Sequence, residues 1–205
     1  MADALPILLV HGMGRSPVSM LRLGAALKRE GHAVRYFAYA CAIESFAGIA
    51  TRLRQRLAGE PPLVAIGHSL GGLLLRAACD GLEQPPSRLV MLGTPNRSPR
   101  WARAMARNPL YRAITGDSGQ LLADPARVEA LPIPALPTLV IAGDAGPQWP
   151  RTPTAGIAND LVVAVDETPL DGARHVVLPV RHTFMMHAPS VLALVREECL
   201  RAGQI

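Results

Sequence analysis

The sequence predicts an α/β protein, a three-layer α/β/α sandwich around a six-stranded, mostly parallel sheet. Six short apolar runs rich in Val, Ile and Leu recur along the 205 residues, which is typical of strands buried on both faces of a parallel sheet. Helical patterns separate most of these runs, and such alternation produces right-handed βαβ units. In a sheet of this kind, functional side chains gather at the carboxyl ends of the strands.

The expected elements follow in chain order. The expected strands are Leu5–Val10, Ala33–Tyr39, Leu63–Gly67, Arg88–Leu92, Thr138–Ala142 and His175–Val180. The expected helices are Val18–Glu30, Ile43–Leu57, Gly71–Leu82 and Ser190–Ala202. The chain shows no internal repeat and no linker composition, so we expect residues 1–205 to form a single domain.

One long connection, between Leu92 and Thr138, departs from the alternation. It holds a helical piece at Arg97–Arg107, a second near Ala123–Leu131, and the Pro-rich Leu131–Pro137. Because it leaves the carboxyl end of the fourth strand, we expect a lid-like insertion at about residues 97–137.

Arg100, Arg103 and Arg107 fall on one face of the first helical piece. A solvated surface is the simplest interpretation of this face. The alternative is a collar for an anionic substrate or a lipid head group, with weak contact to an anionic membrane surface.

The composition limits the classes of partner. Hydrophobic residues make up 49% and charged residues 18%, which fits a globular protein and excludes wholesale disorder. The net charge of +5 comes almost entirely from arginine, since Lys28 is the only lysine. The arginines are scattered and no recognition motif accompanies them, so we expect no nucleic acid partner.

The cysteines and the apolar runs indicate a cytoplasmic protein. The three cysteines, Cys41, Cys79 and Cys199, are far apart, which argues against a disulfide framework and a zinc cluster. No His-Glu-x-x-His pattern occurs, so we expect neither a metal nor a cofactor. Leu5–Val10 is too short for a signal-peptide core, and no run approaches the roughly 20 apolar residues that span a bilayer.

The segment from Leu63 to Leu75 carries the strongest functional signal. A strand runs directly into Gly67-His68-Ser69-Leu70-Gly71, and a helix follows without a linker, which is the arrangement of a nucleophile elbow. Ser69 must adopt a strained backbone conformation at the tip, where side chains in place of Gly67 and Gly71 would collide across the turn. We therefore expect Ser69 to be a nucleophile and the Leu70 N–H to face a developing oxyanion.

A second oxyanion donor is expected from the loop after the first strand. This loop reads His11-Gly12-Met13-Gly14, and its glycines allow it to fold tightly toward a substrate. An ordinary Gly-rich turn is the alternative. Beside Ser69, the Met13 N–H is the expected partner of the Leu70 N–H.

A serine nucleophile needs a histidine base within hydrogen-bond reach. His182 directly follows the last strand, where a loop would deliver it beside the elbow. His187, close to the last helix and able to cap it, is the alternative. The other four histidines, His11, His32, His68 and His175, lie in turns or at the wrong end of a strand.

A carboxylate must fix the tautomer of the base, and two aspartates compete for this role. Asp160 sits in a loop long enough to reach the histidine, and the apolar run after it would anchor it. Asp144 ends the fifth strand but has little slack to turn under the histidine. We favour Asp160 and keep Asp144 as the alternative, while Asp166 and Asp171 look exposed.

A second serine segment, Gly116-Asp117-Ser118-Gly119, is similar to the serine segment of chymotrypsin-like proteases. No all-β pattern surrounds it, and it lies among polar residues after a helical stretch. We therefore expect it to be a turn.

With these residues placed, the chain resembles the α/β-hydrolase superfamily, and specifically the minimal bacterial triacylglycerol lipases and esterases. The segments that carry the likeness are His11–Gly14, Gly67–Gly72, Gly93–Asn96 and the tail from Asn159 through His182 to the closing helix. The resemblance implies that Asp160 is the triad acid and His182 the base. The insertion and a Pro-rich loop at Gly146–Gly156 depart from the family where substrates enter.

The resemblance and the residues together predict a serine hydrolase that cleaves carboxylic esters through an acyl-enzyme. Its expected substrate is a small-molecule acyl ester or a lipid. An acyltransferase or a thioesterase would use the same triad, because acceptor choice depends on water exclusion. A non-catalytic scaffold that binds a lipid or a protein is the third hypothesis.

Overall fold

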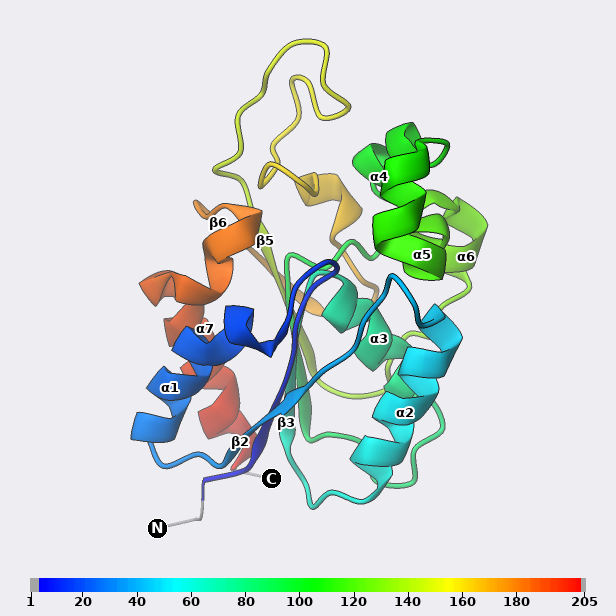
Figure 1. The fold of residues 1–205 in the computed structure, drawn as a ribbon. Coiled ribbons are helices and arrows are strands. Elements are labelled where there is room, and N and C mark those ends of the chain that lie inside the picture. Colours follow the sequence, from blue (N-terminus) through cyan, green and yellow to red (C-terminus); the bar gives the residue numbers. More distant parts are fainter. Residues whose placement is uncertain (1–3, 204–205) are drawn as a thin grey trace.

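A computed structural model describes residues 4–203. Its centre is one six-stranded sheet in the order β2-β1-β3-β4-β5-β6, and every strand pair is parallel. The strands are β1 (Ile7–Val10), β2 (Val34–Phe37), β3 (Val64–His68), β4 (Arg88–Leu92), β5 (Thr138–Gly143) and β6 (Arg174–Leu178). The predicted α/β fold is confirmed, and Figure 1 shows the sheet with its helices.

The main helices are α1 (Leu21–Arg29), α2 (Phe46–Ala58), α3 (Leu70–Cys79) and α7 (Pro189–Ala202). Each lies within a few residues of its expected place. The first expected helix is divided, since a 3₁₀ turn at Pro17–Met20 precedes α1. Further 3₁₀ turns lie at Val165–Glu167 and His182–His187.

The insertion contains three helices where two were expected: α4 (Arg100–Met105), α5 (Pro109–Ala123) and α6 (Pro125–Glu129). Asn108 starts the unexpected helix by accepting from the N–H groups of Leu110 and Tyr111. The prediction of a turn at Gly116–Gly119 is wrong, because the segment lies inside α5. Gly116 has a φ of 55°, so it kinks the helix and breaks the apolar period that would reveal it.

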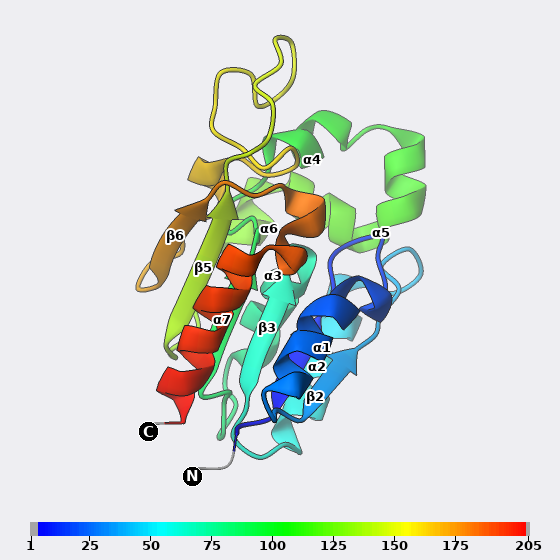
Figure 2. The same ribbon diagram turned by 90° about the vertical axis from the view of Figure 1, so that its left-hand side faces the viewer.

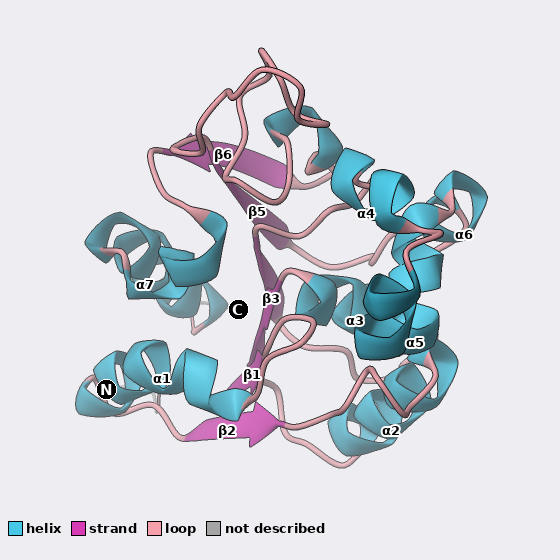
Figure 3. Cartoon of the chain, turned by 45° about the horizontal axis from the view of Figure 1, so that its top comes forward, coloured by secondary structure: helices cyan, strands magenta, loops and turns pink. Residues whose placement is uncertain are grey.

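Helices cover both faces of the sheet, as Figures 2 and 3 show: α1 and α7 lie on one face, α2 and α3 on the other. Alternate residues of the central strands point to opposite faces of the sheet and pack against the helices there. In β1, Ile7 and Leu9 pack with α1 and α7, whereas Leu8 and Val10 pack with α2 and α3. Burial on both faces explains why the strands read as continuous apolar runs.

The carboxyl ends of the strands carry the long connections. The insertion helices and the loop between β5 and β6 both stand above this edge of the sheet (Figure 1). None of the helices in residues 4–203 is long and apolar enough to cross a membrane.

An ion cluster joins α7 to the sheet. The Glu198 carboxylate lies 3.0 Å from Arg88 and 3.2 Å from Arg174, and the residue is 3% exposed. Its neighbour Glu197 pairs with Arg174 and Arg201 at the surface. Since a buried cation without a partner is far costlier than an exposed one, the two glutamates should contribute unequally to stability.

We predict that Glu198→Ala lowers the free energy of unfolding by about 2–3 kcal/mol, because it leaves the part-buried Arg88 unpaired. Glu197→Ala, on the same helix, should cost less than about 1 kcal/mol. Urea unfolding of both variants checks this expectation. Equal losses would show that the cluster does not anchor α7.

Candidate functional site

The turn between β3 and α3 places Ser69 at the carboxyl edge of the sheet. Ser69 has a φ of 53°, a region that non-glycine residues rarely adopt, so the expected strained backbone is confirmed. A Cβ on Gly67 would lie 2.5 Å from the Gly72 nitrogen across the turn, as expected. At Gly71 the obstacle is different, since a Cβ there would lie 2.5 Å from the Val10 carbonyl oxygen of β1.

His182 follows β6 at the same edge, and its side chain is 7% exposed. Its ring centre lies 4.8 Å from that of His68, the residue immediately before Ser69. Gly93, at the end of β4, leaves space for the ring, because a Cβ there would lie 3.0 Å from the His182 Nδ1. Within residues 4–203 no hydrogen bond joins the Ser69 hydroxyl to the His182 imidazole. The contact of the His182 ring with His68 is what places it near Ser69.

Asp160 meets His182 directly. The Asp160 Oδ2 lies 2.6 Å from the His182 Nδ1, and the His182 N–H donates to the Asp160 carbonyl. The other carboxylate oxygen accepts from the N–H groups of Val162 and Val163. Because a carboxylate only accepts, Nδ1 is the donor, which leaves Nε2 of the neutral ring with a free lone pair.

The alternative acid and base lie elsewhere. Asp144 is exposed at the end of β5, and His187 packs against Phe184, with ring centres 5.9 Å apart. Asp166 and Asp171 are exposed, as expected. Of the candidate carboxylates in the described chain, Asp160 alone pairs with a histidine.

Sequence reasoning placed His68 only in a turn, yet this residue is part of the support for His182. The His68 Nε2 lies 3.1 Å from the His182 carbonyl oxygen and donates to it. Burial lowers the pKa of His68 well below its usual value, and a charge on His182 lowers it further. His68 therefore stays neutral and holds the His182 main chain. Its place next to the serine in the elbow was the only available signal.

The loop after β1 is braced from within. The buried ring of His11 stacks on Tyr39 with ring centres 4.2 Å apart, and the Tyr39 hydroxyl donates to the His11 carbonyl oxygen. Burial lowers the pKa of His11, so this ring also favours the neutral form. The bracing holds the next residues of the loop, including Met13, beside the elbow.

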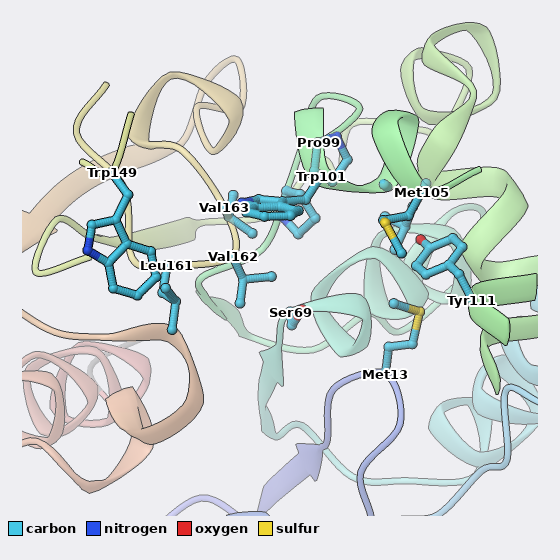
Figure 4. A pocket seen from close by; sticks show the side chains of 13 residues that line it. Met13, Ser69, Pro99, Trp101, Met105, Tyr111, Trp149, Leu161, Val162 and Val163 are labelled. Carbon is cyan, nitrogen blue, oxygen red and sulfur yellow. The ribbon is translucent and has the colours of Figure 1, made fainter. Parts of the chain in front are cut away.

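A cavity of about 440 Å³ opens above Ser69 (Figure 4). On one flank, α4 and α5 contribute Trp101, Met105 and Tyr111, and on the other the loop after β5 contributes Trp149 and Val162. The rest of its lining is Met13, Ser69, Pro95, Pro99, Ala102, Leu122, Leu161 and Val163. None of the described side chains that line the cavity is charged, so it suits a neutral, apolar group.

The arginine face of the insertion is only partly free. Arg100 forms ion pairs with Asp166 and Glu167, each at 2.8 Å. Arg103 and Arg107 are exposed. Among the described residues, no cluster of three or more His, Cys, Asp or Glu is arranged to hold a metal ion.

Comparison with solved structures places this fold among lipases and esterases. The mature form of the Bacillus licheniformis lipase BlEst2 matches with a TM-score of 0.76 at 15% identity, over 97% of this chain and 93% of that one. A structure from the metagenome-derived lipolytic enzymes LipS and LipT matches with a TM-score of 0.68 at 17% identity, over 98% and 95%.

Tomato methylketone synthase I, complexed with 2-tridecanone, matches with a TM-score of 0.64 at 14% identity, over 97% of this chain and 98% of that one. No protein-family model matches the sequence, and no curated protein matches it. The chain therefore has the α/β-hydrolase fold, in agreement with the resemblance seen in its motifs, and at these identities the likeness extends to the fold alone.

Proposed function

We propose that the protein is a carboxylic ester hydrolase of the esterase and lipase type, with Ser69, His182 and Asp160 as its catalytic triad. The 2.6 Å contact between Asp160 and His182, beside the elbow that carries Ser69, is the observation that carries the proposal. A buried carboxylate that fixes a histidine next to a strained serine is the arrangement that activates a hydroxyl for acyl transfer.

The reaction follows from the tautomer of His182. Its Nε2 takes the proton of the Ser69 hydroxyl as Oγ attacks the ester carbonyl, and Asp160 stabilises the imidazolium that forms. The imidazolium gives this proton to the leaving alkoxy oxygen, and the acyl group remains on Oγ. Water, activated by the same nitrogen, then hydrolyses the acyl-enzyme and releases the acid.

The N–H groups of Leu70 and Met13 are the proposed oxyanion donors. Leu70 is the first residue of α3, where N–H groups have no partner within the helix and the helix dipole favours negative charge. Met13 lines the cavity together with Ser69. Within residues 4–203 its N–H donates to no backbone carbonyl, so it is available for a substrate oxygen.

The lining of the cavity indicates the substrate class. The lining formed by residues 4–203 is mostly apolar and includes no charged side chain, which favours a small-molecule ester or a lipid with an aliphatic acyl group. The ligand named for the tomato neighbour, 2-tridecanone, is a long aliphatic ketone, and the first neighbour described above is a lipase.

We predict that Ser69→Ala lowers kcat for p-nitrophenyl esters by about three to six powers of ten, because the nucleophile is lost. Ser118→Ala is the matched control. Ser118 belongs to the other serine segment, and its buried hydroxyl makes no hydrogen bond with the described residues, so its removal should leave kcat unchanged. Wild-type turnover by Ser69→Ala would refute the assignment of the nucleophile.

We also predict that Asp160→Asn lowers kcat by about 10³- to 10⁴-fold, because an amide would stabilise the wrong tautomer of His182. Asp144→Asn, at an exposed position, should stay within about threefold of wild type. The same ester assay checks both variants after circular dichroism has shown that they fold. The reverse outcome would assign the triad acid to Asp144.

A further inference from the structure

One buried arginine, Arg76, forms hydrogen bonds near both ends of the insertion. Arg76 lies on α3, the helix that begins directly after Ser69, and is 2% exposed. None of the acidic side chains in residues 4–203 forms an ion pair with it. A buried cation without a carboxylate is unusual, because its desolvation must be offset by hydrogen bonds alone.

The Arg76 guanidinium joins the two ends of the insertion. Its Nη1 donates to the Asn96 Oδ1 at 3.1 Å, where the insertion starts. Its Nη2 and Nε donate to the carbonyl oxygens of Leu131 and Pro132, at 2.8 and 3.1 Å, just after α6. The planar guanidinium carries donors on three separate nitrogens and so reaches acceptors on both segments at once, whereas a lysine ammonium has all its donors on one nitrogen.

Burial lowers the pKa of Arg76 to about 10, so the side chain keeps its charge and its donors at neutral pH. These bonds run from the rigid helix of the elbow to a segment that forms one flank of the cavity. These bonds therefore fix the position of the flank relative to α3, the helix that begins directly after Ser69.

Further bonds tie the insertion to the rest of the fold. The Asn96 amide donates to the Thr168 carbonyl oxygen, and the buried Glu167 accepts from both the main chain and the side chain of Arg100. At the other side, the Asp117 carboxylate of α5 accepts from the Phe46 N–H at the start of α2. The insertion is thus bonded near its start, its middle and its end.

We propose that Arg76 is a positioning residue that fixes the insertion as a permanent wall of the cavity, against which the acyl chain of the substrate packs. The acyl assignment rests on the proposed function. The insertion side is the more enclosed flank. Its Ala102 and Leu122 are 5% exposed or less. On the opposite flank Val163 is buried, but Trp149, Leu161 and Val162 are 38–59% exposed. Each methylene buried there gains contact that an acetyl group never reaches.

The test compares acyl chain lengths. Arg76→Lys should lower kcat/KM for p-nitrophenyl octanoate about tenfold and leave that for p-nitrophenyl acetate within about twofold. Arg54→Lys, which replaces an exposed arginine bonded to the Ala77 carbonyl oxygen, is the matched control and should leave both esters unchanged. Loss of folded protein alone would lower both esters by the same factor, so an unchanged ratio of the two would overturn the proposal.

Hydrogen exchange of the wild-type protein tests the wall without a variant, and the measurement on the free protein needs no activity. A fixed wall requires the amides of α4 and α5 to exchange as slowly as those of α2, and to change little after reaction with an alkylphosphonate. Collective opening of α4 and α5 in the free protein, closed by the phosphonate, would show a moving lid and overturn the proposal. If wild type cleaves no ester while the exchange result holds, the failure belongs to the proposed function and not to the wall.

Discussion

The hydrogen bond between Asp160 and His182 sets the geometry at the upper edge of the sheet. It joins the loop after β5 to the turn after β6, two segments that are 22 residues apart in the sequence. Two hydrogen bonds join these residues: one between the side chains, and one from the His182 main-chain N–H to the Asp160 carbonyl oxygen. Since the carboxylate also accepts two main-chain N–H groups, its position is fixed before any substrate arrives.

Small residues around this pair allow the chain segments to approach closely. Gly93 leaves space for the imidazole, and Gly143 leaves space for Asp160, where a Cβ would lie 2.8 Å from the Asp160 Cβ. Gly12 does the same for the neutral ring of His68. The site is therefore a product of backbone packing at the ends of parallel strands, which explains why distant residues converge there.

Much of this arrangement was predictable from the sequence, because strands buried on both faces are continuous apolar runs and the elbow has a local pattern. The reach of Asp160 could be argued from loop length. By contrast, α5 was missed because Gly116 interrupts its period, and the turn predicted for Gly116–Gly119 was wrong for the same reason. The bonds of Arg76 could not be foreseen, since an arginine on a helix ordinarily reads as a solvated residue.

The insertion connects the substrate cavity to the helix that follows Ser69. Its helices supply one flank of the cavity, and its bonds to α3 relate that flank to the strained serine. A site preorganised in this way pays for its order during folding and not during binding.

A crystal structure of the protein after reaction with an alkylphosphonate would show whether Ser69, His182 and the two N–H groups form one catalytic site. We expect phosphorus bonded to the Ser69 Oγ, a phosphoryl oxygen within hydrogen-bond distance of the Met13 and Leu70 N–H groups, and the His182 Nε2 beside the adduct. A protein that stays unmodified, or an adduct on another residue with His182 turned away from Ser69, would contradict this expectation.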